Sequence, residues 1–299
     1  MPNPDPIQAV NPWSGALFEW KAQSTWIGRT AKWLEPRLTA DACTILATPS
    51  TTIDAIDDSA WVDRVCSVVG EDAQHLTENL AAAIEEARMV AYHGCRPVDA
   101  GVFHAEGIKC NDPAVLAEHA RGLVADLPGL AMLRPQIEAR LAAFHDRDRD
   151  AGQVYLIADD RLLPNGCGHY LLYGSEWLQV LLGWEAHAAL RMHGAPTIIE
   201  VHLPLNAIAP KTRKELAWCL LREWSRQMAT RDDLVPELDF SFVLRRDIPP
   251  EWIAGHTHPS EITDPFYSKI VRQNPIRTCR HCDDRVLTGS PELQGKAFL

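Results

Sequence analysis

The apolar stretch Met89–Pro97 is the sequence feature that most constrains the fold. A run of residues with strand-forming side chains leads to His93, and Gly94 then lets the chain turn sharply away. This pattern predicts a buried strand that presents an imidazole near its end. A single histidine at such a position is common in protein cores, so its chemical role depends on partners elsewhere in the chain.

Amphipathic stretches lie on both sides of this strand. Leu76, Leu80 and Ile84 recur at helical spacing before it, and after it Asp112-Pro113 supplies the N-cap and first-turn proline of a helix that continues to Leu127. Further helices are expected over 61–69, 133–144, 175–182 and 216–228, and further strands over 44–46, 153–158, 197–203 and 239–244. Helices and strands mixed in this way predict an α+β protein.

Tryptophan is concentrated at the start of the chain. Five of the ten tryptophans lie in roughly the first fifth of the sequence, at positions 13, 20, 26, 33 and 61. Such residues usually pack a loop-rich segment onto a larger domain, although they can also form a surface for a partner. We therefore expect a Trp-rich N-terminal segment, residues 1–60, packed on a main domain formed by residues 61–299.

Charge and hydropathy exclude several classes of protein. The formal net charge of -11 argues against a broad electrostatic surface for nucleic acid or anionic membranes. No run of about 18 apolar residues is present, as a membrane-spanning helix would need. The chain also lacks a positively charged start followed by an apolar block. These features predict a cytoplasmic protein without membrane partners.

The cysteine pattern does not predict a metal site. The eight cysteines are scattered singly, apart from Cys279 and Cys282, which differs from a secreted disulfide framework. Cys279 and Cys282 have the spacing of half a zinc knuckle, and His256 and His258 could bind a metal from a strand. A structural zinc needs four ligands, and neither pair has a second pair at knuckle spacing. No metal is therefore expected.

Three segments in a fixed order carry a further pattern. They are Tyr92-His93-Gly94 with Gly107-Ile108, then Val154–Ile157 followed by Tyr170-x-x-Tyr173-Gly174-Ser175, then Phe242-x6-Pro249-Pro250-Glu251-x-Ile253. In this order they resemble the ADP-ribosyltransferase superfamily of the His-Tyr-Glu type, shared by diphtheria-like toxins, poly-ADP-ribose polymerases and RNA 2'-phosphotransferases. The resemblance covers residues 88–255. It implies a split β-sheet core flanked by helices, with NAD as the substrate.

The resemblance also implies roles for particular residues. His93 would form a hydrogen bond to a ribose of NAD, and the backbone of Gly94 would pair with the nicotinamide amide. Tyr170 or Tyr173 would stack on the nicotinamide, and of the two we expect Tyr173. Further NAD contacts are implied for Arg96, through a phosphate, and for Tyr155.

The catalytic carboxylate has two candidates, Glu237 and Asp239. Cleavage of the bond between nicotinamide and ribose builds positive charge on the sugar, which a nearby carboxylate stabilises. In a strand that runs from Glu237 to Leu244, both acids point to the same face because side chains alternate. Family spacing favours Asp239 or even Ser241 as the key position, whereas the residue type favours Glu237.

The sequence thus predicts an NAD-dependent ADP-ribosyltransferase that modifies a protein or nucleic-acid acceptor and that an antitoxin or other partner protein could restrain. Two alternatives remain open. The same site could pass ADP-ribose to water, as in an NAD glycohydrolase of the toxin or defence type. A catalytically degenerate fold could instead act as an interaction module, with residues 1–60 and the tail that contains Cys279 and Cys282 as its contact surfaces.

Overall fold

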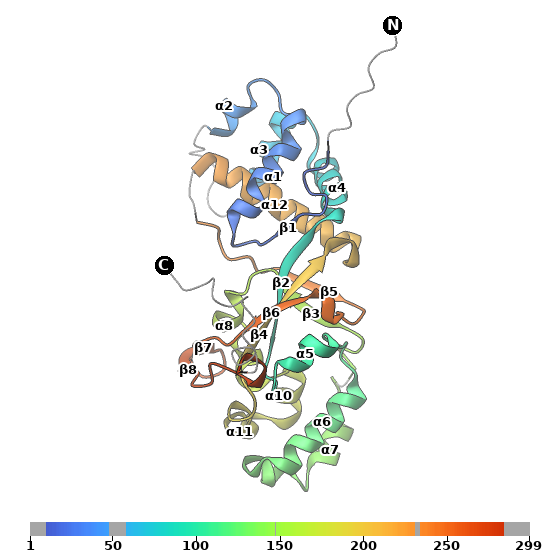
Figure 1. The fold of residues 1–299 in the computed structure, drawn as a ribbon, viewed down its shortest axis with the longest axis vertical. Coiled ribbons are helices and arrows are strands. Elements are labelled where there is room, and N and C mark those ends of the chain that lie inside the picture. Colours follow the sequence, from blue (N-terminus) through green and yellow to red (C-terminus); the bar gives the residue numbers. More distant parts are fainter. Residues whose placement is uncertain (1–9, 48–57, 147, 231–233, 284–299) are drawn as a thin grey trace. The chain divides into compact units, whose positions relative to one another are not determined.

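The computed structural model describes residues 10–47, 58–146, 148–230 and 234–283, and it confirms the α+β class (Figure 1). A six-stranded mixed sheet has the strand order β5-β3-β2-β4-β6, with β1 paired in parallel to β2, and β7 and β8 form a separate antiparallel hairpin. The strands are β1 Leu17–Phe18, β2 Arg88–Cys95, β3 Val154–Ile157, β4 Thr197–Pro204, β5 Ser241–Leu244, β6 Ile253–Thr257, β7 Glu261–Asp264 and β8 Ile270–Gln273.

The chain forms two compact units. Unit 1 comprises residues 1–90 and 202–242, and unit 2 comprises residues 91–201 and 243–299. All three boundaries fall inside strands, in β2, β4 and β5, so each of these strands belongs partly to both units. The predicted division at residue 60 falls within unit 1.

Unit 1 is built around the long helix α12, Pro210–Thr230. The helical spacing of its apolar residues predicted a helix over 216–228. Helix α12 packs against α1 Ile27–Leu34, α2 Ala42–Ala47, α3 Asp58–Val69 and α4 Ala73–Ala83 (Figure 1). Trp13, Trp20 and Trp26 are fully buried, and the indole of Trp20 stacks on that of Trp26 with ring centroids 5.3 Å apart. These tryptophans are therefore core residues of unit 1.

The predicted strand at residues 44–46 is wrong, because this segment lies in helix α2. Thr44 and Ile45 are β-branched and favour strands by propensity. The helix packs against α3 and α12, and Leu46 is buried. Tertiary contact therefore outweighs the local preference of the two β-branched residues.

Unit 2 contains the shorter helices. They are α5 Gly101–Glu106, α6 Pro113–Asp126, α7 Ile137–Ala143, α8 Leu162–Asn165, α9 Gly168–Tyr173, α10 Glu176–Leu182 and α11 His187–Arg191. Both predicted helix caps are confirmed. The carboxylate of Asp112 accepts a hydrogen bond from the backbone of Ala114 at 2.8 Å, and the hydroxyl of Ser175 accepts one from the backbone of Leu178 at 3.1 Å.

A two-residue bridge joins the end of α5 to the segment before β6. The backbone amide of Ile108 donates to the carbonyl of Ile248 at 2.9 Å, and the amide of Ile248 donates back to the carbonyl of Ile108 at 2.9 Å. Gly107 precedes the bridge with φ +74°, and a Cβ atom at this position would lie 1.9 Å from the Ile248 carbonyl oxygen. Only glycine combines this conformation with so close an approach.

Among the residues that the structure describes, no helix is both long enough and apolar enough to cross a membrane.

We predict that Gly107→Ala destabilises the protein more than Gly152→Ala. Both glycines have positive φ, +74° and +70°, so each alanine costs about 1–3 kcal/mol in backbone strain. A Cβ at Gly107 must also push the Ile248 carbonyl away, whereas nothing lies within 4 Å of a Cβ at Gly152. Urea unfolding of the two variants measures the difference, and equal losses of stability would contradict the role given to the close approach.

Candidate functional site

His93 lies in β2, as predicted, with its imidazole held by the neighbouring strand. Its Nδ1 atom is 3.0 Å from the backbone carbonyl oxygen of Tyr155 in β3, and β2 and β3 pair with Tyr92 opposite Ile157. Because a carbonyl oxygen can only accept, Nδ1 carries the proton and Nε2 keeps its lone pair. The side chain is half-buried, and the Phe103 ring of α5 packs edge-on to it with centroids 6.4 Å apart.

The surroundings of His93 favour its neutral form. Burial lowers the pKa of His93 below its usual value, and the hydrogen bond to the Tyr155 carbonyl opposes this effect only in part. The imidazole therefore presents a fixed neutral tautomer with Nε2 as an acceptor.

Gly94 is the point at which α8 and α9 approach β2. A Cβ at Gly94 would lie 2.7 Å from Cδ2 of Leu163 and 3.5 Å from Cβ of Tyr170. The structure thus brings Tyr170 of α9 next to the residue that follows His93. Burial raises the pKa of Tyr170 to about 12, so its hydroxyl is neutral at physiological pH.

The structure places Tyr173 in the core. Its side chain is 1% exposed, its hydroxyl donates to the fully buried carboxylate of Asp264, and its ring stacks on His187 with centroids 4.1 Å apart. Tyr155 is 39% exposed, and its hydroxyl donates to Asp150 at 3.0 Å. Neither tyrosine ring contacts His93 through any interaction among the described residues.

Arg96 has an internal set of partners. Its guanidinium donates to the backbone carbonyls of Leu171, Leu190, Arg191 and His193, which belong to α9, α11 and the turn that follows. These contacts tie the end of β2 to two helices. The donors that the sequence assigned to an NAD phosphate are thus used within unit 2.

Glu237 and Asp239 precede a strand rather than lie in one. The predicted strand from residue 239 is wrong at its start, because β5 begins at Ser241. Both carboxylates are exposed, and Leu238 between them is buried. Exposed and buried side chains therefore alternate here as expected, although these residues lie outside the strand. Both acids belong to unit 1, whereas His93 belongs to unit 2.

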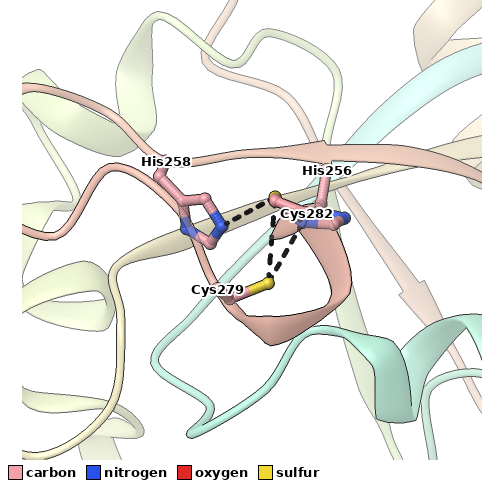
Figure 2. Close-up of side chains that lie close together, drawn as sticks. All are labelled: His256, His258, Cys279 and Cys282. Atoms are coloured by element: carbon pink, nitrogen blue, oxygen red, sulfur yellow. Dashed lines mark hydrogen bonds between the residues drawn. The ribbon is translucent and has the colours of Figure 1, made fainter. Parts of the chain in front are cut away.

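A second cluster lies in unit 2, where His256, His258, Cys279 and Cys282 converge (Figure 2). The Sγ atoms of the two cysteines are 3.9 Å apart, and Cys282 Sγ lies 3.1 Å from His256 Nε2 and 3.6 Å from His258 Nε2. In the sequence the histidine pair and the cysteine pair are separated by twenty residues, and neither pair alone predicts a metal site. The signal that could have joined them is that each pair supplies two of the four ligands of a zinc site.

Comparison with family models, with curated proteins and with solved structures finds no match to this chain.

We predict that His93 makes the stability of the protein depend on pH near neutrality. Because the pKa of His93 is lowered in the folded state, the unfolded chain takes up its proton first as the pH falls, and the free energy of unfolding decreases below about pH 6.5. One such proton contributes a slope of at most about 1.36 kcal/mol per pH unit. Urea unfolding between pH 5.5 and 7.5 should give a shallower slope for His93→Gln than for the wild type. Identical slopes would show that His93 does not contribute.

Proposed function

We propose that this protein cleaves NAD between nicotinamide and ribose and transfers the ADP-ribose to a protein or nucleic-acid acceptor, within the split-sheet architecture that its motifs resemble. The observation that supports the proposal is the pair of contacts at the end of β2: His93 Nδ1 lies 3.0 Å from the Tyr155 carbonyl oxygen, and a Cβ at the next residue, Gly94, would lie 3.5 Å from Cβ of Tyr170.

A neutral histidine suits this reaction. The ribose becomes positively charged as nicotinamide leaves, so an imidazolium beside it would raise the barrier. Burial lowers the pKa of His93 and keeps the ring uncharged. With the proton fixed on Nδ1 by the Tyr155 carbonyl, Nε2 accepts a hydrogen bond from a ribose hydroxyl.

We assign the aromatic role to Tyr170 rather than to Tyr173. Tyr170 is half-buried and adjoins Gly94, whereas Tyr173 is enclosed and bonded to Asp264. A tyrosine ring stacked on nicotinamide would hold the plane of the leaving group, while the backbone of Gly94 pairs with its amide.

The carboxylate is assigned to Glu237 or Asp239. Both side chains are exposed, and Leu238 between them is buried. In this reaction an ionised carboxylate stabilises the positive charge that develops on the ribose. Because the two acids flank one buried residue, single substitutions can separate their contributions.

Incubation of the pure protein with labelled NAD and a cell lysate tests the proposal. We expect label on a macromolecule, with the rate reduced about 100-fold in His93→Ala because the ribose loses its positioning contact. Tyr170→Ala should weaken NAD binding about tenfold, since stacking of a ring on a base contributes roughly 1–3 kcal/mol. One of Glu237→Gln and Asp239→Asn should lose activity while the other keeps it. His145→Ala, which changes an exposed histidine of the same unit, serves as the matched control.

The same experiment distinguishes the alternatives. Free ADP-ribose without labelled macromolecule would identify an NAD glycohydrolase and overturn transfer. Equal NAD turnover in the wild type and His93→Ala would overturn the site. Absence of both NAD binding and NAD turnover would leave the interaction module as the remaining hypothesis.

A further inference from the structure

We infer that His256, His258, Cys279 and Cys282 bind one zinc ion, which links the segment with the two cysteines to the end of strand β6. The inference is independent of the proposed NAD chemistry, because it depends only on this cluster and its surroundings in unit 2.

The spacing of the four ligand atoms fits a tetrahedral metal ion. With metal distances of about 2.3 Å to sulfur and about 2.0 Å to nitrogen, a tetrahedron sets sulfur atoms about 3.8 Å apart and sulfur and nitrogen about 3.5 Å apart. The two Sγ atoms are 3.9 Å apart. Three of the four distances between sulfur and nitrogen are 3.1, 3.5 and 3.6 Å, and all four ligand atoms lie within 4.8 Å of one another.

Local backbone structure directs the side chains of the histidine pair and of the cysteine pair toward each other. His256 and His258 are two residues apart at the end of β6, so both side chains leave the same face of the strand. Cys279 and Cys282 lie three residues apart at the start of a helical turn, which brings both thiols to one side. Figure 2 shows the two imidazoles and the two thiols facing one another.

Both histidines use the ring nitrogen that points away from the cluster in a hydrogen bond within the protein. His258 Nδ1 donates to the backbone carbonyl of Pro196 at 2.9 Å, which leaves the lone pair of Nε2 for the ion. His256 Nδ1 lies 2.9 Å from Nε2 of His104, a residue of α5. Histidines that bind metals commonly use their second nitrogen in this way, which fixes the orientation of the ring.

The hairpin between the two pairs brings them to the same place. Strands β7 and β8 pair Glu261 with Gln273, and just beyond them the backbone amide of Asn274 donates to the carbonyl of Ser260 at 2.7 Å. The buried side chain of Asn274 also donates to the carbonyls of Pro259 and Ile276. The chain therefore leaves and returns at one place, with a histidine pair before the hairpin and a cysteine pair after it.

The ligand set favours zinc in a structural role. Two thiolates neutralise a divalent cation, and a site of two sulfur and two nitrogen ligands in a tetrahedron is typical of zinc. All four positions are filled by the protein, which leaves none for a water or a substrate. A disulfide between the cysteines would need their sulfur atoms about 2.05 Å apart, and they are 3.9 Å apart.

A metal here would also fasten helix α5. His104 of α5 contacts His256, and its ring stacks on that of His281 with centroids 4.4 Å apart. The carboxylate of Asp99 accepts hydrogen bonds from the backbone of Gly101, at the start of α5, and from that of His281. Three segments that are far apart in the sequence thus meet around one ion.

Metal analysis of the full-length protein tests the inference. Native mass spectrometry should find one zinc per chain, and a chelator should remove it. Addition of Co²⁺ to the metal-free protein should give the visible absorption of tetrahedral cobalt together with a thiolate charge-transfer band. Bound iron in place of zinc, a disulfide between Cys279 and Cys282, or the absence of bound metal would each overturn the inference.

Variants identify the ligands. Cys282→Ser should weaken zinc binding by more than about 100-fold, because it removes a ligand, whereas His104→Ala keeps all four ligands and should weaken it by about 10–100-fold. Cys66→Ser changes a free cysteine in unit 1 and should bind zinc as the wild type does. If Cys282→Ser fails to fold, the His104 variant and the cobalt spectrum of the wild type still decide. If neither His104→Ala nor Cys282→Ser changed the zinc affinity, the ion would bind elsewhere, and the inference would be overturned.

Discussion

Much of unit 2 depends on the exchange of two hydrogen bonds between Ile108 and Ile248. This bridge fixes the end of α5 to the segment that enters β6, and Gly107 is the residue that allows the backbones to meet. Phe103 of α5 packs against His93, and His104 of the same helix contacts His256 of β6. One short backbone contact therefore sets the position of a wall of the proposed NAD site and of a support for the proposed zinc site.

Periodicity and capping predicted some of the elements around these sites but did not predict α5, α9, β6 or the β7–β8 hairpin. The helices after Asp112 and Ser175 begin where a side-chain oxygen can accept from the first backbone amides, and strand β2 follows from its apolar run. These features are local, because the atoms that decide them lie within a few residues of one another. The strand at residues 44–46 failed for the opposite reason, since contacts with α3 and α12 decide its conformation.

The side chains of the sites were harder to predict because long-range packing selects them. Tyr170 and Tyr173 both lie on α9. The rotation of this helix depends on the close contact between Gly168 and the backbone of Thr263, because a Cβ at Gly168 would lie 2.1 Å from the Thr263 carbonyl oxygen. That contact crosses nearly a hundred residues of sequence and leaves no periodic signal. The convergence of the histidine and cysteine pairs likewise depends on how the β7–β8 hairpin closes at Asn274.

Helix α5 connects the two proposed sites in a way that has a thermodynamic consequence. Phe103 and His104 are consecutive, so their side chains leave the helix about 100° apart, one toward His93 and one toward His256. A helix of six residues has little room to bend between them. If an ion at the cluster tightens nucleotide binding beside His93 by some factor, linkage requires that the nucleotide tighten the ion by the same factor. The ion and the nucleotide would then each raise the affinity of the protein for the other, and helix α5 would transmit the effect.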